Sequence, residues 1–152
     1  MTALLSLWMP IDRLLAGWGL SLWLLALRLY VGWQFFGSGL VKVQDWSSTV
    51  ALFETEYSVP LLSPQLAALA GAGGELLLPP LLFAGLFTRP AALALAVVNG
   101  VAVLSYPALF GFDCPAAIQS HAWWGAALVG LGCAGAGRLS VDGWRAGRAG
   151  RA

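Results

Sequence analysis

Four long stretches of apolar residues decide what kind of fold this sequence can form. They run from about Leu20 to Val43, Pro64 to Phe87, Pro90 to Phe110 and Ala116 to Gly137. A helix of about 20 apolar residues crosses the hydrocarbon core of a bilayer. The chain is 59% hydrophobic and only 10% charged, whereas soluble domains carry about a quarter charged residues. We therefore predict an all-α integral membrane four-helix bundle, with residues 1–152 forming a single domain.

Two shorter segments have the spacing of helices that lie in the membrane interface. Residues 1–18 place apolar side chains three and four positions apart. Between the first two spans, Trp46, Val50, Phe53 and Tyr57 share one helical face. We expect an interfacial helix at each place, because one apolar face and one polar face suit that boundary. Tryptophans near predicted helix ends, where rings settle at headgroup level, are Trp8, Trp18, Trp46, Trp123, Trp124 and Trp144.

The charged residues outside the spans separate into two groups. Four spans place both termini on one side, together with the Arg-rich tail 138–152. Because positive residues mark the cytoplasmic side of a membrane protein, we expect both termini in the cytoplasm. The net charge of +1 gives no field for nucleic acid, so that partner is excluded. The predicted cytoplasmic group is Arg13, Arg89, Arg138, Arg145, Arg148 and Arg151, and the opposite group is Asp45, Glu54, Glu56 and Asp113 with Lys42.

Two ionisable residues, Arg28 and Glu75, lie deep inside predicted spans. An unpaired charge at the bilayer centre costs at least about 2.5 kcal/mol on insertion scales, so we expect a salt bridge between them. Pro79 and Pro80 remove backbone hydrogen bonds from the turn that bears Glu75, which predicts a kink there. The pair is either a structural element of the bundle or part of a ligand pocket to which Asn99 belongs.

His121, the one histidine of the chain, begins the fourth predicted span. It is either a hydrogen-bonded interfacial residue or a proton acceptor beside a redox or quinone site. One histidine cannot hold a haem between two histidine ligands. Cys114 and Cys133 have the spacing of neither a zinc site nor a disulfide, so we expect free thiols and no bound metal. The residues that His121 could meet in an outer polar cluster are Lys42, Asp45 and Asp113.

Four motifs follow one another along the chain. They are LRLYVG at 27–32, GLVK at 39–42, Glu75 followed by LFAGLFTRPAA at 82–92, and GRLSVD at 137–142. Their order and spacing resemble the DoxX family of small bacterial membrane proteins. The resemblance implies a multi-pass, four-helix protein of the bacterial inner membrane. The recurrent polar positions that it carries over are Arg28, Lys42, Glu75 and Arg89, the last in a cytoplasmic turn.

The same resemblance implies a subunit of a membrane redox system with a quinone as the ligand, since family members are commonly described as oxidoreductases or their subunits. The sequence has no motif for a covalently bound cofactor, flavin, haem or iron–sulfur cluster, which leaves enzymatic activity open. One alternative is a small proton-coupled transporter that works through Glu75, although a charge partner makes a carboxylate exchange protons reluctantly. The other is a non-catalytic scaffold for a second copy or a protein partner, including a metal-peptide system. Residues 57–62 and the tail around Ser140 and Asp142 resemble a branch of the family found beside small secreted metal-binding peptides.

Overall fold

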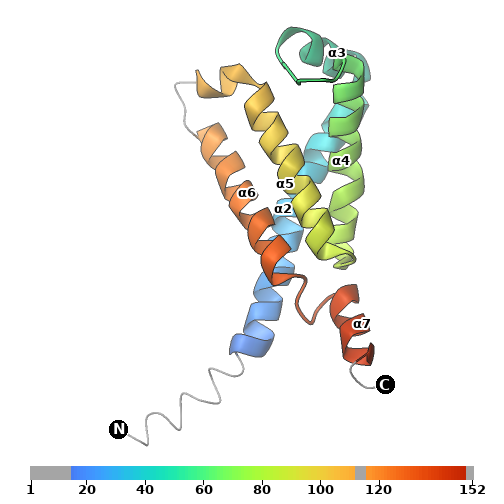
Figure 1. Ribbon diagram of the computed structural model, residues 1–152, viewed down its shortest axis with the longest axis vertical. Helices are drawn as coiled ribbons and strands as arrows, with labels where there is room; N and C mark the ends of the chain where they lie inside the picture. Colours follow the sequence, from blue (N-terminus) through green and yellow to red (C-terminus); the bar gives the residue numbers. More distant parts are fainter. Residues whose placement is uncertain (1–14, 112–115, 150–152) are drawn as a thin grey trace, which may run out of the picture.

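The computed structural model describes residues 15–111 and 116–149, and every regular element in those two ranges is helical. Figure 1 shows the long helices side by side, with a short helix across one end and another at the opposite end. The elements are a π-helical turn (Leu15–Gly19), α2 (Leu20–Gln44), α3 (Trp46–Thr55), α4 (Pro64–Ala84), α5 (Thr88–Ser105), a 3₁₀ turn (Pro107–Phe110), α6 (Ala116–Ala134) and α7 (Val141–Ala149). The predicted all-α class is confirmed.

Among the described residues, three segments are long and apolar enough to cross a membrane: Gly17–Gln44, Pro64–Ala84 and Thr88–Ser105. α6 has 19 residues and packs against α5 and α2. Polar residues, among them Gln119 and His121, fall in its first turns, and it is not one of these three candidate spans. Three of the four predicted spans are therefore confirmed as candidate spans, and α6 stays a predicted one.

Local stop signals make three of the helices shorter than expected. α4 ends at Ala84, before the predicted Phe87, because Gly85 adopts a left-handed conformation (φ 66°) that closes the helix. α5 ends at Ser105 because Pro107 has no N–H with which to continue the helical ladder. Gly135, also left-handed, ends α6 at Ala134. The three confirmed spans were thus placed correctly, and the ends of α4, α5 and α6 were predicted too far along the chain.

The short helix predicted between the first two spans is α3. The Asp45 side chain accepts a hydrogen bond from the Ser48 N–H at 3.0 Å and so caps its first turn. Phe53 is buried against Ala67 and Ala68 of α4. The apolar face of α3 therefore packs on protein. The other predicted interfacial helix falls mainly on residues 1–14, outside the described residues, and Leu15–Gly19 continues directly into α2.

Small residues on α2 bring α2 and α4 into close contact. A Cβ atom added to Gly32 would lie 2.6 Å from a ring carbon of Phe83, and one added to Gly39 would meet Leu76 at 2.9 Å. The hydrogen side chain of glycine thus allows the two helices to approach more closely than a methyl group would permit. The core of the bundle, buried between these and the other long helices, consists of Leu24, Val31, Phe35, Leu82, Ala91, Ala92, Leu95, Leu128 and Leu131.

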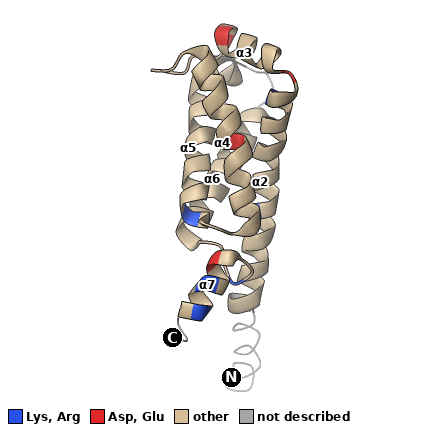
Figure 2. Ribbon diagram, turned by 90° about the vertical axis from the view of Figure 1, so that its right-hand side faces the viewer, with Lys and Arg blue, Asp and Glu red and all other residues tan. Residues whose placement is uncertain are grey.

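The two ends of the bundle carry opposite charge (Figure 2). We name them by their short helices. The α3 end carries Asp45, Glu54 and Glu56, and the α7 end carries Arg89, Arg138, Arg145 and Arg148 with Asp142. The first described element, Leu15–Gly19, and the last, α7, lie at this same end of the bundle.

Candidate functional site

Arg28 is fully buried, but it is not paired with Glu75. Its guanidinium donates one hydrogen bond to the carbonyl of Leu82 at 2.9 Å and another to the carbonyl of Leu139 at 2.6 Å. Leu82 lies in the last turn of α4, where the helix dipole presents partial negative charge. The predicted Arg28–Glu75 salt bridge is therefore wrong, and backbone carbonyls at the α7 end take the place of the carboxylate.

The register of α2 against α4 explains this error. The prediction assumed that both helices end level with each other. In the structure α2 extends through Leu15–Gly19 beyond the turn at Gly85, and Gly39 is the residue that faces Glu75. Arg28 is eleven positions from Gly39, which corresponds to about 16 Å along a helix at about 1.5 Å per residue. The two charges consequently lie at different depths.

Glu75 instead forms an ion pair with Lys42, at 2.7 Å between Nζ and Oε2. The ammonium of Lys42 also donates to the Ser38 hydroxyl at 2.8 Å. Only 9% of the Glu75 side chain and 19% of the Lys42 side chain is exposed. Lys42, which the sequence placed in an outer cluster with Asp45, thus reaches inward from α2 to satisfy the buried carboxylate.

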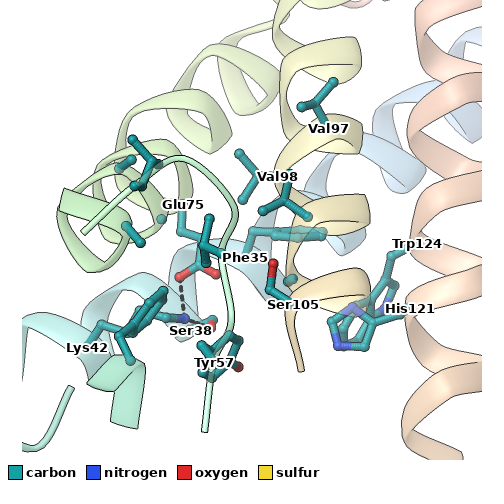
Figure 3. Close-up of a pocket in the computed structure, with 18 of the residues that line it drawn as sticks. Phe35, Ser38, Lys42, Tyr57, Glu75, Val97, Val98, Ser105, His121 and Trp124 are labelled. Carbon is teal, nitrogen blue, oxygen red and sulfur yellow. Dashed lines mark hydrogen bonds and ion pairs between the residues drawn. The ribbon is translucent and has the colours of Figure 1, made fainter. Parts of the chain in front are cut away.

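The ion pair forms one wall of a cavity of about 410 Å³ beneath α3. Figure 3 shows Lys42 and Glu75 on one side of it, with His121 and Trp124 of α6 on the other and Ser105 between them. Aromatic and aliphatic side chains form most of the remaining wall. The polar residues that line the cavity are Gln34, Ser38, Lys42, Tyr57, Glu75, Ser105 and His121, and the apolar ones include Phe35, Phe53, Val97, Val98, Val101 and Trp124.

Asn99 fixes the orientation of His121. The Asn99 amide nitrogen donates to the backbone carbonyl of His121 at 3.0 Å, and its oxygen lies 2.8 Å from Nδ1 of the ring. A backbone carbonyl can only accept, so the amide oxygen must face the ring and Nδ1 must carry the proton. In the neutral ring, Nε2 then holds a lone pair. His121 is therefore hydrogen bonded, and it keeps an acceptor nitrogen at the cavity.

Ser105 brings a hydroxyl group into the cavity that has no hydrogen-bond partner among the described residues. The residue is only 1% exposed. Its backbone carbonyl accepts a hydrogen bond from the Ser58 N–H at 2.8 Å, so the end of α5 is fixed. Leaving a buried polar group unpaired costs free energy, which makes this hydroxyl a natural contact for a ligand.

The segment after α3 forms a roof over the cavity. The ring of Tyr57 stacks between Phe53 and Tyr106, with centroids 4.6 and 4.9 Å away. The Tyr106 hydroxyl donates to a carboxylate oxygen of Glu56 at 2.9 Å. These contacts connect the segment after α3 to the end of α5. The roof therefore has its own aromatic and polar attachments.

Several predicted site residues lie away from the cavity. Asp45 caps α3 on the surface, where hydrogen bonds from Ser48 lower its pKa. Asp113 and Cys114 lie outside the described residues. Cys133 is a free, exposed cysteine, and no group of three or more metal-ligating side chains occurs in the described part of the chain. The exposed Arg89 side chain donates to the carbonyl of Gly132 at 3.4 Å. It lies at the α7 end and does not line the cavity.

A second polar arrangement lies at the α7 end. The carboxylate of Asp142 accepts the N–H groups of Phe87 at 3.0 Å and Thr88 at 2.9 Å, and so caps α5 from a distant part of the chain. Partial burial raises the pKa of Asp142, but the two backbone donors outweigh it and hold the pKa below its ordinary value. The Asp142 N–H donates to the carbonyl of Gly85 at 2.9 Å. This arrangement gives the predicted GRLSVD motif a structural role.

The sequence profile of the DoxX family matches residues 23–108, more than half of the chain and most of the cavity wall. This chain belongs to the DoxX family. Comparison with curated proteins and with solved structures found no match. The matched part of this DoxX protein includes Lys42, Glu75 and Ser105, whereas His121 and Trp124 on α6 lie beyond it.

Sequence reasoning missed several of the cavity residues, among them Ser105, Tyr57 and Trp124. Ser105 gave no signal of its own, and Tyr57 was assigned only to the apolar face of a predicted interfacial helix, because tyrosine is common at the membrane surface. Trp124 was assigned to the interface, yet its ring contacts Phe35 and His121 edge-on at 5.8 and 5.0 Å. Consecutive residues point in different directions on a helix, so Trp123 is exposed whereas Trp124 faces the cavity. That difference in direction is the only sequence signal that could have separated an interfacial tryptophan from a cavity residue.

Proposed function

We propose that this DoxX family membrane protein binds a quinone head group in the cavity beneath α3 and serves as a subunit of a membrane redox system. The unpartnered hydroxyl of Ser105 carries the proposal, because it is a buried polar group aimed at a cavity. The cavity volume of about 410 Å³ falls within the roughly 300–1,000 Å³ of small-molecule sites. Its mostly apolar wall with a few convergent polar groups is typical of such sites.

The donors in the cavity suit the two ring oxygens of a quinone. Ser105 offers its O–H from α5. Lys42 has three N–H donors, of which described residues take two, Ser38 and Glu75. One donor on each side of the cavity thus remains for a ligand with two acceptor oxygens. The aromatic rings of Phe35 and Trp124 supply apolar surface between them.

His121 is the residue that can hold a proton beside such a ring. Its Nδ1–H is directed to Asn99, which leaves Nε2 as an acceptor. A quinone, when bound, supplies two-electron redox chemistry coupled to protons. The chain's own contribution in this proposal is to orient the head group through Ser105 and Lys42, to exclude water with the roof, and to accept or return a proton at Nε2.

Quinone binding to the purified full chain in mild detergent tests the proposal. Quenching of tryptophan fluorescence by a benzoquinone should saturate, since Trp124 lies in the cavity wall. Ser105→Ala should weaken binding about three- to tenfold, the value of one hydrogen bond. Ser120→Ala is the matched control, because that hydroxyl lies outside the cavity lining and donates within α6, to the Ala116 carbonyl. Equal affinities for both variants, or no saturable quenching at all, would refute the proposal.

Replacing His121 tests the proton role separately. His121→Gln keeps polarity and approximate size but removes the titratable group. In native membranes the change should weaken quinone-linked activity and alter its pH dependence between about pH 5 and 8. A scaffold protein would show neither effect. A proton-coupled transporter would instead lose transport in Glu75→Gln, and its unaltered form would bind no quinone.

The topology that goes with this function has four crossings. We propose that α6 is the fourth, that both termini are cytoplasmic, and that the protein resides in a bacterial inner membrane. The arginines at the α7 end and the carboxylates at the α3 end support this orientation. In a chain with Cys114→Ser and Cys133→Ala, an impermeant thiol reagent should label Thr55→Cys on intact cells and leave Arg145→Cys unlabelled. The reverse pattern would overturn the orientation, and labelling of both would overturn α6 as a crossing.

A further inference from the structure

The cavity beneath α3 has an apolar rim that faces the membrane, and this rim indicates how a ligand reaches it. We propose that the cavity opens laterally into the bilayer between α4 and α5, and that its ligand is a lipid-borne molecule with a polar ring and an apolar tail. This inference rests on the proposed quinone function for the ring. It adds the access route and the tail, which that function does not require.

The rim is built from side chains at the edges of two neighbouring helices. Val97 and Val101 of α5 line the cavity and are nevertheless 66% and 40% exposed. Ala70 of α4 also lines the cavity and is exposed. The cavity therefore reaches the outside of the bundle between these two helices.

The floor of this opening lies at the level of Val97, about one turn deeper than Val101. A Cβ atom added to Gly74 would lie 3.0 Å from a methyl group of Val98, so α4 and α5 are in contact there. One turn towards the α3 end, Ala70 and Val101 both line the cavity and stay exposed. The opening is consequently bounded below by the contact of the two helices and above by the roof.

The roof makes access from the water phase at the α3 end less direct. Tyr57 is stacked on both faces, and the Ser58 N–H is bonded to the end of α5 at Ser105. A water-soluble ligand would have to break these contacts to pass. The lateral opening has no comparable hydrogen bonds or ring stacks across it in the described part of the chain.

The opening lies at the depth of the acyl chains. Val101 is four residues and Val97 eight residues before the last residue of α5, which places them about 6 and 12 Å inside that end of the helix. Ala70 is six residues into α4, about 9 Å from its start. Because both helices are candidate membrane spans, these side chains face lipid, and a molecule that enters between them arrives from the hydrocarbon layer.

The polarity of the cavity then sets the orientation of the ligand. The ion pair and the Ser105 hydroxyl lie inside, whereas the rim of valines and alanine is apolar throughout. A polar ring therefore binds inward, and an apolar chain attached to it leaves through the rim without burying any polar group. A ligand without a chain gains nothing from the rim.

Filling the rim tests the proposal with two matched probes. Full-length protein in phosphatidylcholine nanodiscs is titrated with a benzoquinone that carries a decyl tail and with the same benzoquinone without a tail. Val101→Phe should lower the affinity for the tailed probe at least tenfold, because its chain occupies the opening, and should change the tailless affinity by less than threefold. Ala70→Leu narrows the opening from the other helix and should act in the same direction. Val129→Phe, at an exposed valine of α6 outside the cavity, is the control and should change neither.

The outcomes separate this inference from the function on which it rests. If the tailless probe binds to the unaltered protein and both rim variants weaken the two probes equally, or weaken neither, the lateral opening is refuted and the quinone site stands. If neither probe binds to the unaltered protein, the quinone function itself is refuted and the opening falls with it.

Discussion

The ion pair between Lys42 and Glu75 gives the sharpest test of the arrangement inside the bundle. We expect Lys42→Met and Glu75→Leu each to destabilise the protein, and the double variant to be more stable than the sum of the two losses predicts. Removing one partner leaves the other charge buried and unpaired, which typically costs about 3–5 kcal/mol. Removing both leaves no unpaired charge.

The expected coupling follows from the geometry. At 2.7 Å and an effective dielectric constant of about 20, two unit charges attract each other by about 6 kcal/mol. Desolvation of the two ions offsets several kcal/mol of this attraction. We therefore expect an interaction free energy of about 2–3 kcal/mol, at the upper end of the values measured for contacting residues.

Equilibrium unfolding in mixed micelles, followed by far-ultraviolet circular dichroism, measures all four free energies of the cycle. A second cycle with Arg28→Met and Glu75→Leu is the matched control, because Arg28 contacts carbonyls of Leu82 and Leu139 instead. That cycle should be additive within about 0.5 kcal/mol. Additivity in the Lys42 cycle, or equal coupling in both, would refute the pairing described here.

Three further variants test the α7 end and the buried arginine. Gly85→Ala should lower the midpoint of thermal unfolding, since a left-handed alanine costs roughly 1–2 kcal/mol and its methyl group would overlap Arg28. Gly73→Ala should not lower it, because a Cβ atom added at Gly73 has no neighbour within 4 Å. Arg28→Met should cost about 1–3 kcal/mol in the free energy of unfolding, because two buried carbonyls lose their donor. Asp142→Asn should make α7 more sensitive to protease at pH 7. The pKa of Asp142 is lowered in the folded protein, so its cap stabilises the protein above the unfolded pKa and is lost as the carboxylate becomes protonated. The unaltered protein should therefore become sensitive to protease only as the pH falls below about 4. A protease pattern independent of pH would count against the cap.

The helices themselves were predictable because each depends on its own stretch of sequence. Apolar runs long enough to span a bilayer identified α2, α4 and α5, and the spacing of Phe53 and its neighbours identified α3. Packing between α2 and α4 was also predictable, since Gly32 and Gly39 share one face. These features require no knowledge of how deep one helix sits against another.

The partners of the charged residues did require that knowledge. Arg28 and Glu75 were paired because both lie in the middle of a span, and a shift in register of a few turns separated them. Lys42 was placed outside because it ends a helix, yet its side chain reaches Glu75, 33 positions away in sequence. Ser105 has a role only because roof, α4 and α6 meet around it. Such convergence has no local signal in the sequence.

The hydrogen bonds of Arg28 and Asp142 have a consequence for biosynthesis. Arg28 contacts residues 54 and 111 positions further along the chain, and Asp142 caps a helix that begins 54 positions before it. A chain emerging from the ribosome can place α2, α4 and α5 in the membrane before residues 137–142 exist. Until that segment arrives, the guanidinium lacks one acceptor and α5 lacks its cap. The closure of the bundle at the α7 end is thus the last step of its assembly, and a premature stop before Leu139 should yield inserted helices that quality-control proteases remove.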